Sequence, residues 1–439
     1  MSERYIAAVE ISSSKIIASI GKTSGEGQLD VVAIEEENDV EGVRYGIIQN
    51  LEETSVRVSR LLNRLEHHTG VSPRKIKGVF VGLSGRSLKS ITAEVSLNLP
   101  EGTEITEDII NKLTEDAKRK AIDNTLEVVD AVPRIYTVDK AETHKPKGAV
   151  GSHIQATFDL IVCRPELKRN LSRTIPDKLG IKIEGFVVTA LATGHLILTA
   201  DEKRLGCMLV DIGAETTTVT IYRKGCLRYF VTLPLGGRNI TRDITSLNVL
   251  EERAEQIKIA IGNAMGQDSV PPLNVNGVRH TDVNNLVVAR SEEIVANIME
   301  QIEYAGLKEA DLPGGIICIG GGSKLQGMID LIELQSGLPV RRGQLPQYVR
   351  LEADHAGNKN MIQVVSVLYA GATLSQQECL EIPERGEIPI TGTAPVEPES
   401  PKEPSEKVEK TNKIIKGLKM RIAKMFSNPD DADDSELME

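Results

Sequence analysis

The sequence predicts an α/β protein built from two similar halves. The strand–turn–strand pattern of residues 5–20 returns over residues 207–222, about 200 residues later, and further strand and helix patterns follow each copy. Aromatic residues make up only 3% of the chain and Trp is absent, so Ile, Val, Leu and Ala must fill the cores. Cores of this composition are typical of buried parallel strands that are covered by helices.

The first half opens with a predicted hairpin. Its strands, over residues 5–9 and 16–20, flank a polar turn of three serines at 12–14. A third strand is expected over 29–35. Residues 51–68 then predict an amphipathic helix, because apolar residues recur there at helical spacing.

Residues 85–164 change character, and we interpret them as a small inserted α+β subdomain. Strand patterns over 90–99 and 155–163 flank a helix at 107–121, and a pair of strands is expected around 128–138. The elements expected after the insertion are helices over 165–179 and 191–199, strands over 181–188, 207–212 and 216–222, and helices over 251–265, 291–305 and 364–374.

The composition excludes several classes of function. A formal net charge of −11 argues against nucleic-acid binding by the globular body, because phosphates would be repelled. The five cysteines include no C-x-x-C pair, so we expect reduced thiols and neither a zinc site nor disulfides; all but Cys379 lie in apolar surroundings. There is no signal-peptide pattern and no run of about 20 apolar residues, so no spanning helix is expected.

The strongest motif begins near the end of the strand over 207–212. Asp211 is followed by Gly213, which permits a tight turn, and by Thr216 and Thr217, which start the next strand. In such a hairpin, backbone N–H groups and hydroxyls wrap a phosphate, while the carboxylate holds hydrated Mg²⁺. An ordinary hairpin with a polar tip is the alternative, and this motif alone leaves both open.

Two further turns match the first motif. In the first half, Glu10 is followed by the candidate phosphate ligands Ser12, Ser13, Ser14 and Lys15. Near the end of the second half, a strand runs into Gly320, Gly321, Gly322 and Ser323, and a helix start is expected there. Glycines let the backbone approach a ligand closely, and a helix N-terminus favours anions. Three such turns in this order indicate a nucleotide site.

Together the three turns resemble the phosphate 1, phosphate 2 and adenosine motifs of the actin/Hsp70/sugar-kinase superfamily. The resemblance implies an actin-like (ribonuclease H-like), two-lobed ATPase fold with ATP and Mg²⁺ between the lobes. It makes Asp211 the catalytic residue and, together with Glu10, a metal ligand through water. Glu255 and Lys258, three residues apart, resemble the pair that brackets the ribose; an exposed ion pair is the alternative.

Within the superfamily, the sequence is most similar to the FtsA family of actin-like bacterial cell-division proteins. The similar segments are residues 46–53, 81–85, 198–203 and 236–243, together with the position of the insertion. The resemblance implies polymerisation, binding of the tubulin-like ring protein FtsZ, recruitment of later division proteins, and a place on the cytoplasmic face of the inner membrane. The expected division is subdomains 1A (1–84 and 165–200), 1C (85–164), 2A (201–235 and 313–380) and 2B (236–312), a disordered linker (381–410), an amphipathic helix (411–427) and an acidic tail (428–439).

The chain departs from the family pattern around the first turn. Glu10 stands where Asp is usual and Ser12 where Gly is usual, and the longer Glu side chain is expected to extend toward the metal. Thr189 and Ala190 stand where many superfamily ATPases have an acid or Gln that orients the attacking water. Because positioning of water is a large part of such catalysis, we expect ATP to bind and to be cleaved slowly at most.

The C-terminal segment reverses the charge of the chain. Residues 381–410 are rich in Pro, Glu, Ser and Thr and predict a disordered linker. On a helix over 413–426, the apolar residues Ile414, Ile415, Leu418, Ile422, Met425 and Phe426 share an arc of about 120°, and Lys416 and Arg421 are among the cations outside it. Such a helix lies on anionic phospholipid. Docking on a partner or on the body is the alternative.

The partner surface is expected in subdomain 2B, where family members receive the C-terminal peptide of FtsZ. Arg290, Glu292 and Glu293 are the candidates, at the start of the helix expected over 291–305; plain solvation is the alternative. A membrane-tethered adaptor is therefore the predicted function. A sugar-kinase-like phosphotransferase lacks a convincing catalytic Asp, and an Hsp70-like chaperone lacks its peptide-binding domain. Pilus-assembly and shape-determining actin homologues are the nearest alternatives.

Overall fold

The computed structural model describes residues 3–23, 28–38, 40–120, 122–266, 274–275, 277–352 and 361–383. The predicted linker beyond residue 383, the predicted membrane helix over 411–427 and the acidic tail over 428–439 lie outside the described residues. The same holds for the lipid-facing candidates Ile414, Ile415, Lys416, Leu418, Arg421, Ile422, Met425 and Phe426.

The described residues form the following elements. The strands are β1 (Arg4–Ile11), β2 (Lys15–Thr23), β3 (Leu29–Asn38), β4 (Val43–Arg44), β5 (Ile47–Ile48), β6 (Lys75–Ile76), β7 (Gly78–Leu83), β8 (Lys89–Glu104), β9 (Glu127–Val138), β10 (Ala141–Thr143), β11 (Val150–Cys163), β12 (Lys182–Val188), β13 (Cys207–Ile212), β14 (Thr217–Arg223), β15 (Cys226–Leu233), β16 (Asn274–Val275), β17 (Val278–Arg279), β18 (Ile316–Ile319), β19 (Val340–Arg342), β20 (Val349–Leu351) and β21 (Leu380–Glu381). The α-helices are α1 (Leu51–His67), α2 (Glu107–Lys118), α3 (Glu166–Thr174), α4 (Pro176–Leu179), α5 (Thr189–Ile197), α6 (Ala200–Leu205), α7 (Gly237–Thr245), α8 (Glu251–Ile261), α9 (His280–Tyr304), α10 (Met328–Ser336) and α11 (Ile362–Leu374), and Glu309–Asp311 (η1) and Gly322–Lys324 (η2) are 3₁₀ turns.

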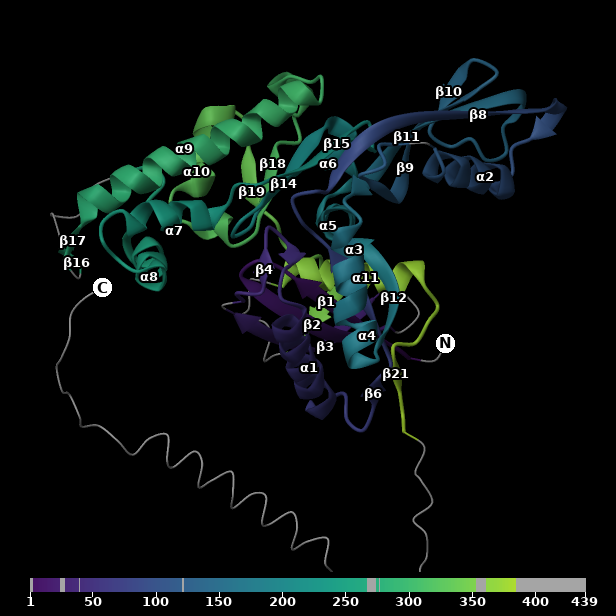
Figure 1. Cartoon of the computed structure of the whole chain (residues 1–439). Helices are drawn as coiled ribbons and strands as arrows, with labels where there is room; N and C mark the ends of the chain where they lie inside the picture. The colour runs from purple at the N-terminus through teal and green to yellow at the C-terminus, as the bar shows by residue number, and fades with distance from the viewer. Residues whose placement is uncertain are drawn as a thin grey trace, which may run out of the picture. The chain divides into compact units, whose positions relative to one another are not determined.

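The two halves repeat one sheet topology. In the first half, β1, β2 and β3 form an antiparallel meander, and β7 and β12 extend it in parallel beyond β1. In the second half, β13, β14 and β15 form the meander, and β18 and β19 extend it in parallel beyond β13. The predicted repeat is thus confirmed, and Figure 1 shows the two sheets with their covering helices.

The insertion after β7 is a layer of antiparallel strands packed against one helix. Strands β8, β9, β10 and β11 form the sheet, and buried residues of α2 join their core (Figure 1). The sequence predicts a pair of strands around 128–138, but these residues form one continuous strand, β9, which pairs with both β10 and β11. A single residue pair, Val231 with Lys89, joins this sheet to the second half.

Four other expectations need correction. The helix expected over 165–179 is two helices, because Pro176 has no N–H with which to continue α3. Helix α9 begins at His280, well before the predicted residue 291. The third glycine turn leads into η2, and α10 begins only at Met328. Among the cysteines, Cys226 and not Cys379 is the one that is only half-buried.

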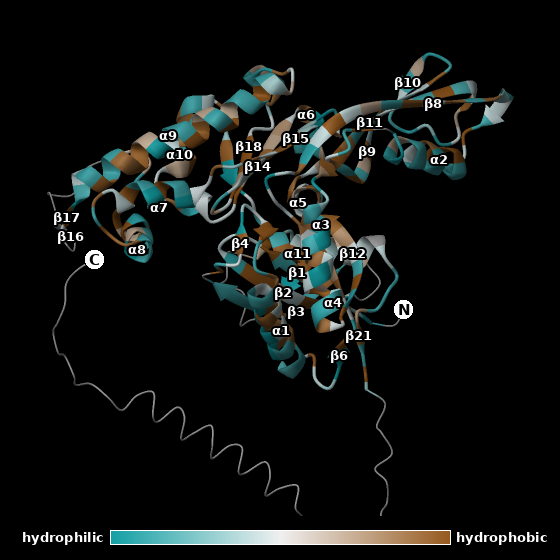
Figure 2. Cartoon of the chain, viewed as in Figure 1, coloured by the Kyte–Doolittle hydropathy of each residue, from teal (hydrophilic) through white to brown (hydrophobic). Residues whose placement is uncertain are grey.

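Three hydrophobic clusters stabilise the described part, although the second half and the insertion share one nine-stranded sheet. The first half, the second half and the insertion each have their own cluster of buried aliphatic side chains. The clusters of the two halves meet along the strands, since Leu209 and Ile317 of the second sheet pack with the first cluster. Figure 2 shows apolar and polar residues interleaved along α9, whose apolar side packs on the second sheet.

Candidate functional site

The three turns that the sequence singles out lie beside one another. We call them the first turn (residues 12–15, which include the first residue of β2), the second turn (213–216, between β13 and β14) and the third turn (320–323, after β18). A Cβ at Gly320 would overlap the Asp211 carboxylate, and a Cβ at Gly237 would lie 3.6 Å from the Cα of Gly322. Gly237 in turn donates its N–H to the carbonyl of Gly213 over 2.9 Å.

Asp211 stands one residue before the end of β13, at the centre of these turns. The side-chain amide of Gln363 on α11 donates to both carboxylate oxygens, over 3.2 and 3.1 Å. Burial raises the pKa of Asp211, and the Gln363 amide and the Lys15 ammonium oppose that effect. The position has the carboxylate chemistry that a hydrated Mg²⁺ requires.

Glu10 stands at the corresponding place in β1, but its carboxylate is engaged differently. Ser84 donates to one oxygen over 2.8 Å and Thr189 donates to the other over 2.7 Å. Gly82 makes room for the long side chain, since a Cβ there would overlap the Glu10 carboxylate. Burial raises the pKa of Glu10 to about 7, against the effect of the two hydroxyls.

The expected extension of Glu10 toward a metal is therefore not what the geometry favours. Both of its oxygens already accept a hydroxyl, from the residue after β7 and from the first residue of α5. Its role as a metal ligand stays a prediction, and it requires those hydroxyls to be exchanged for water of the metal.

The first turn gathers the hydroxyls and the ammonium that were predicted to bind phosphate. Ser12 donates its Oγ hydrogen to the Lys15 carbonyl over 2.8 Å and so closes the turn. Ser13 is buried, and its Oγ accepts the N–H of Gly46 over 3.0 Å; Ser14 is half-buried. Burial lowers the pKa of Lys15 to about 8, although Glu36 lies 4.0 Å away. The charges of Lys15 and Asp211 also act on each other, and each favours the charged form of the other.

The second turn is held by its own backbone. The N–H of Gly213 donates to the Thr216 carbonyl over 2.8 Å. Thr216 is half-buried, but Thr217 is fully buried and its hydroxyl donates to the Leu235 carbonyl over 2.8 Å. The structure therefore brings Gly213 and Thr216 to the site, whereas the Thr217 hydroxyl is already used within the protein.

The third turn is shaped by glycine. Gly320 has a φ of +87°, and a side chain there would overlap both the Asp211 carboxylate and the Ile212 carbonyl. At Gly322 a Cβ would overlap Ile212, whereas Gly321 faces open space. Ser323 is buried, and its hydroxyl donates to the Gly320 carbonyl over 2.8 Å. The turn can thus lie flat against the end of β13.

Glu255 and Lys258 form the ion pair that their spacing predicts, but the lysine is buried. Its Nζ donates to Glu255 over 2.6 Å, to the Thr241 hydroxyl over 2.9 Å and to the Gly237 carbonyl over 3.0 Å. Because Gly237 borders both the second and third turns, Lys258 is a structural neighbour of the site. Binding of a ribose by this pair stays a prediction.

Arg290 and Glu293 lie in the middle of α9, not at a helix start as expected. Arg290 donates through two nitrogens to Asp243 of α7, over 2.6 and 3.0 Å, and pairs with Glu293 as well. Glu292 is exposed. A surface hollow is lined there by Arg242, Asp243, Ser246, Leu286, Ala289, Arg290 and Glu293.

The sequence analysis missed two polar residues, one in the second turn and one that bonds to Asp211 from α11. Glu215, in the second turn, is 1% exposed and pairs with three arginines, Arg44, Arg238 and Arg242. In the sequence, Glu215 could have been suspected only from its place inside the motif that begins at Asp211. The second missed residue is Gln363. It could have been suspected because it is an amide near the start of a mostly apolar helix.

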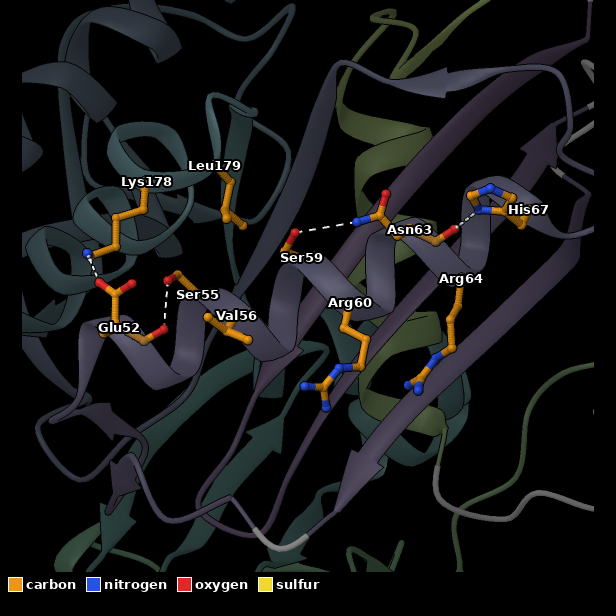
Figure 3. A pocket seen from close by; sticks show the side chains of 10 residues that line it. All are labelled: Glu52, Ser55, Val56, Ser59, Arg60, Asn63, Arg64, His67, Lys178 and Leu179. Atoms are coloured by element: carbon orange, nitrogen blue, oxygen red, sulfur yellow. Dashed lines mark hydrogen bonds and ion pairs between the residues drawn. The ribbon is translucent and has the colours of Figure 1, made fainter. Parts of the chain in front are cut away.

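Three findings concern other parts of the described residues. Figure 3 shows a hollow along α1 that contains none of the predicted ligands; Glu52, Ser55, Val56, Ser59, Arg60, Asn63, Arg64, His67, Lys178 and Leu179 line it. Across all the described residues, the three turns included, no group of three or more His, Cys, Asp or Glu side chains is arranged to hold a metal. None of the helices in the described ranges is long and apolar enough to cross a membrane.

Comparison with known proteins gives one family and one fold. Residues 208–359 match the family model described as cell division protein FtsA, and residues 85–162 match the SHS2 domain inserted in FtsA. The FtsA of Porphyromonas gingivalis is 30% identical over 329 residues, which cover 73% of this chain and 68% of that protein. The FtsA of Neisseria meningitidis serogroup B is 28% identical, over 88% of this chain and 94% of that protein.

One solved structure supports the fold independently. The PilM–PilN type IV pilus biogenesis complex contains a chain with a TM-score of 0.60 to this protein, at 16% identity, over 83% of this chain and 98% of that one. At this identity the likeness concerns the fold alone. The predicted actin-like α/β fold with an inserted α+β subdomain is therefore confirmed.

Proposed function

This chain belongs to the FtsA family of cell division proteins, and on that premise we propose that it is a nucleotide-binding, self-associating adaptor that tethers the FtsZ ring to the cytoplasmic face of the inner membrane. The observation that carries this proposal is a basic amphipathic segment, residues 413–426, at the end of a chain whose net charge is −11. The alternatives of a pilus-assembly actin homologue and a phosphotransferase do not account for that segment.

ATP is the proposed ligand of the three turns, with its phosphates toward the first and second turns and its nucleoside toward the third. The support is chemical: Lys15, the backbone N–H groups of a tight turn and the glycines of the third turn are the groups that polyphosphates and flat bases require. The nucleotide then acts as a conformational ligand at the junction of the halves.

Mg²⁺ would be held chiefly by Asp211 through water. The Asp211 carboxylate is suited to this role, because it interacts with the charge of Lys15 and accepts hydrogen bonds from the Gln363 amide, which a hydrated cation can replace. The bound cation would neutralise the phosphates. Hydrolysis would be slow at most, because Thr189 offers a hydroxyl that already serves Glu10 and provides no acid or amide to orient water.

Self-association is supported by large apolar side chains exposed on two separate parts of the second half. Leu250 precedes α8 and Ile259 lies on it; Tyr304 ends α9 and Leu334 lies on α10. Asn263, just beyond α8, donates to Asn284 of α9, so about 30 Å of helix separates the two patches at 1.5 Å per residue. Contact between unlike patches of successive copies would build a filament.

Mixing two variants tests this head-to-tail contact. Ile259→Asp and Leu334→Asp should each abolish filaments, measured by pelleting and electron microscopy. An equimolar mixture should still form dimers by sedimentation velocity, because each variant keeps one intact patch. Filaments from both variants alone, or monomers only in the mixture, would contradict this interface.

The FtsZ C-terminal peptide is proposed to bind the hollow beside Arg290 and Glu293. The support is a guanidinium held by Asp243 and Glu293 at the rim of a hollow that also contains Leu286 and Ala289. Reversal of charge in Arg290→Glu should weaken binding of the peptide in a fluorescence-anisotropy titration. Unchanged affinity would remove this assignment while leaving the remainder of the proposal intact.

Vesicle co-sedimentation tests the adaptor function itself. The full chain should pellet with vesicles that contain anionic phospholipid, and more so with Mg-ATP, with filaments visible on the lipid. Leu418→Glu places a charge inside the predicted apolar arc and should release the protein; the matched control Met420→Glu places the same charge on the opposite side and should not. Equal binding by both variants would contradict the membrane helix, and soluble monomer under all conditions would contradict the adaptor.

A further inference from the structure

Glu215 occupies an arrangement of donors that is suited to a phosphate group. One of its carboxylate oxygens pairs with the guanidinium groups of Arg44 at 2.8 Å, Arg242 at 2.9 Å and Arg238 at 3.4 Å. The other oxygen accepts the backbone N–H of Tyr45 over 2.7 Å. Several guanidinium groups and a backbone N–H around one oxyanion form the ligand set by which proteins recognise phosphate.

The donors come from both halves of the molecule. Arg44 and Tyr45 belong to the β4–β5 hairpin of the first half, whereas Arg238 and Arg242 lie on α7 of the second half. Ser13 of the first turn also hydrogen-bonds to the Glu215 side chain. A side chain of the second turn is therefore bonded to a hydroxyl of the first turn, which is itself a predicted phosphate ligand.

Glu215 is anionic in this setting. Burial alone would raise the pKa of Glu215, but the Tyr45 N–H and the guanidinium groups of Arg238 and Arg44 outweigh it and hold that pKa below its ordinary value. The carboxylate is only 1% exposed. A second anion that used the same donors would meet a like charge in a region from which water is largely excluded.

We propose that the Glu215 carboxylate fills the position of the terminal phosphate of a bound nucleotide, so that the site favours a nucleoside diphosphate over a triphosphate. The proposal rests on the proposed nucleotide binding and adds its specificity. A nucleotide whose nucleoside lies at the third turn reaches Ser13 with the far end of its phosphate chain. A diphosphate leaves Glu215 in place, whereas a triphosphate must displace it.

Displacement of Glu215 would also release the β4–β5 hairpin. Tyr45 and Gly46 are the two residues between these strands, and both have positive φ, +50° and +76°. Such two-residue turns normally use Asn or Asp at the position that Tyr45 occupies, because a larger side chain is strained there. The Tyr45 N–H is held by Glu215 and the Gly46 N–H by Ser13. ATP would thus free this hairpin, and ADP would not.

The affinities of two variants for two nucleotides test the specificity. Isothermal titration of the full chain with Mg-ADP and Mg-ATP should show tighter binding of ADP. Glu215→Gln, which keeps size and hydrogen bonding, should improve ATP affinity about tenfold and change ADP affinity little. The matched control is Glu251→Gln, since Glu251 lies 3.5 Å from Arg238 but is about half exposed. This control should leave the ratio of the two affinities unchanged.

Each outcome separates this inference from the function on which it rests. If ADP and ATP bind but Glu215→Gln shifts their ratio no more than Glu251→Gln does, the specificity role of Glu215 is wrong and nucleotide binding stands. If neither nucleotide binds the parent chain or Glu215→Gln, both the inference and the nucleotide part of the proposed function are wrong.

Hydrogen exchange gives a second readout that does not depend on affinity. In the nucleotide-free chain, the amides of Tyr45 and Gly46 should exchange slowly. Saturating Mg-ATP should speed the exchange of these two amides, whereas saturating Mg-ADP should not. In the Glu215→Ala variant, the same amides should exchange fast without nucleotide. Slow exchange under saturating Mg-ATP would overturn the displacement.

Discussion

The first and second turns occupy equivalent places in the two halves, yet they carry opposite chemistry. Each follows a strand whose last residue but one is acidic, Glu10 in β1 and Asp211 in β13. Glu10 is enclosed by two hydroxyls, whereas Asp211 accepts hydrogen bonds from the amide of Gln363. The first turn then adds a cation, Lys15, and the second turn adds another anion, Glu215.

This difference shows how a repeated fold becomes an asymmetric site. The repeated strand order fixes where each acid stands, but the side chains that face it come from elements that the repeat does not share. The first acid accepts two hydroxyls, from the residue after β7 and the first residue of α5, and the second accepts only the amide of Gln363 among its side-chain hydrogen bonds to the described residues. A ligand with a chain of phosphates would therefore meet a different partner at each turn.

The largest expected effect concerns the space around Glu10. Gly82→Ala should destabilise the protein by about 3–4 kcal/mol, since a methyl group there overlaps the buried carboxylate. Adding Glu10→Asp shortens the side chain by one methylene and should restore most of the stability. Denaturant unfolding of both single variants and the double variant gives the coupling; strictly additive effects would contradict this packing.

The pH dependence of stability separates the two acids. Glu10 has a folded pKa of about 7 against 4.5 for the free side chain, so the folded protein binds more protons than the unfolded chain within that interval. Stability from this group is therefore full below pH 4.5 and is lost as the pH rises through 7, by about 3 kcal/mol in all. Asp211, whose pKa is also raised, acts in the same direction.

Unfolding free energies between pH 4.5 and pH 7 check this effect, a full unit below the pKa of about 8 at which Lys15 titrates. Glu10→Gln should flatten the profile, and Asp211→Asn should flatten it less. A profile for Glu10→Gln that is as steep as that of the parent chain would show that Glu10 titrates normally.

Removal of each acid should affect nucleotide binding unequally. Asp211→Asn should weaken Mg²⁺-dependent binding about tenfold to a hundredfold, because the metal loses its carboxylate, whereas Glu10→Gln should change it only a few-fold. Titration with a fluorescent ATP analogue, with Mg²⁺ and with EDTA, measures the difference. Equal losses for the two variants would mean that Glu10 turns to the metal when nucleotide binds.

The smallest expected effect lies on the outer face of the first half. Arg60 and Arg64 of α1 pair with Glu35 and Glu37 of β3 but are half-exposed, and Figure 3 shows both side chains beside the hollow. Arg64→Ala should cost about 0.5 kcal/mol or less, because exposed ion pairs are weak. A loss above about 2 kcal/mol in thermal unfolding would show that this network is far stronger than its exposure indicates.

Most of the fold follows from local signals in the sequence. The short apolar runs of β1, β2, β13 and β14, the helical spacing in α1 and the glycines of the third turn each appear within a few neighbouring residues. Errors arose where the local signal was weak. Strand β9 continues through Pro133 because it is paired there with β11 alone, at a register shift, so the missing N–H breaks no second ladder. Helix α9 begins eleven residues before the predicted start. The three turns could be predicted for the same reason as the strands, because each is a short run of polar residues or glycines directly after an apolar strand.

The sequence by itself determined the two repeated sheets, the inserted subdomain and the acid at the end of each first strand. Only the tertiary structure decided what those acids face. The hydroxyls on Glu10 come from positions 74 and 179 residues away, and the Tyr45 N–H lies 170 residues from Glu215. Contacts at such separations depend on how the sheets pack, and no pattern among neighbouring residues encodes them.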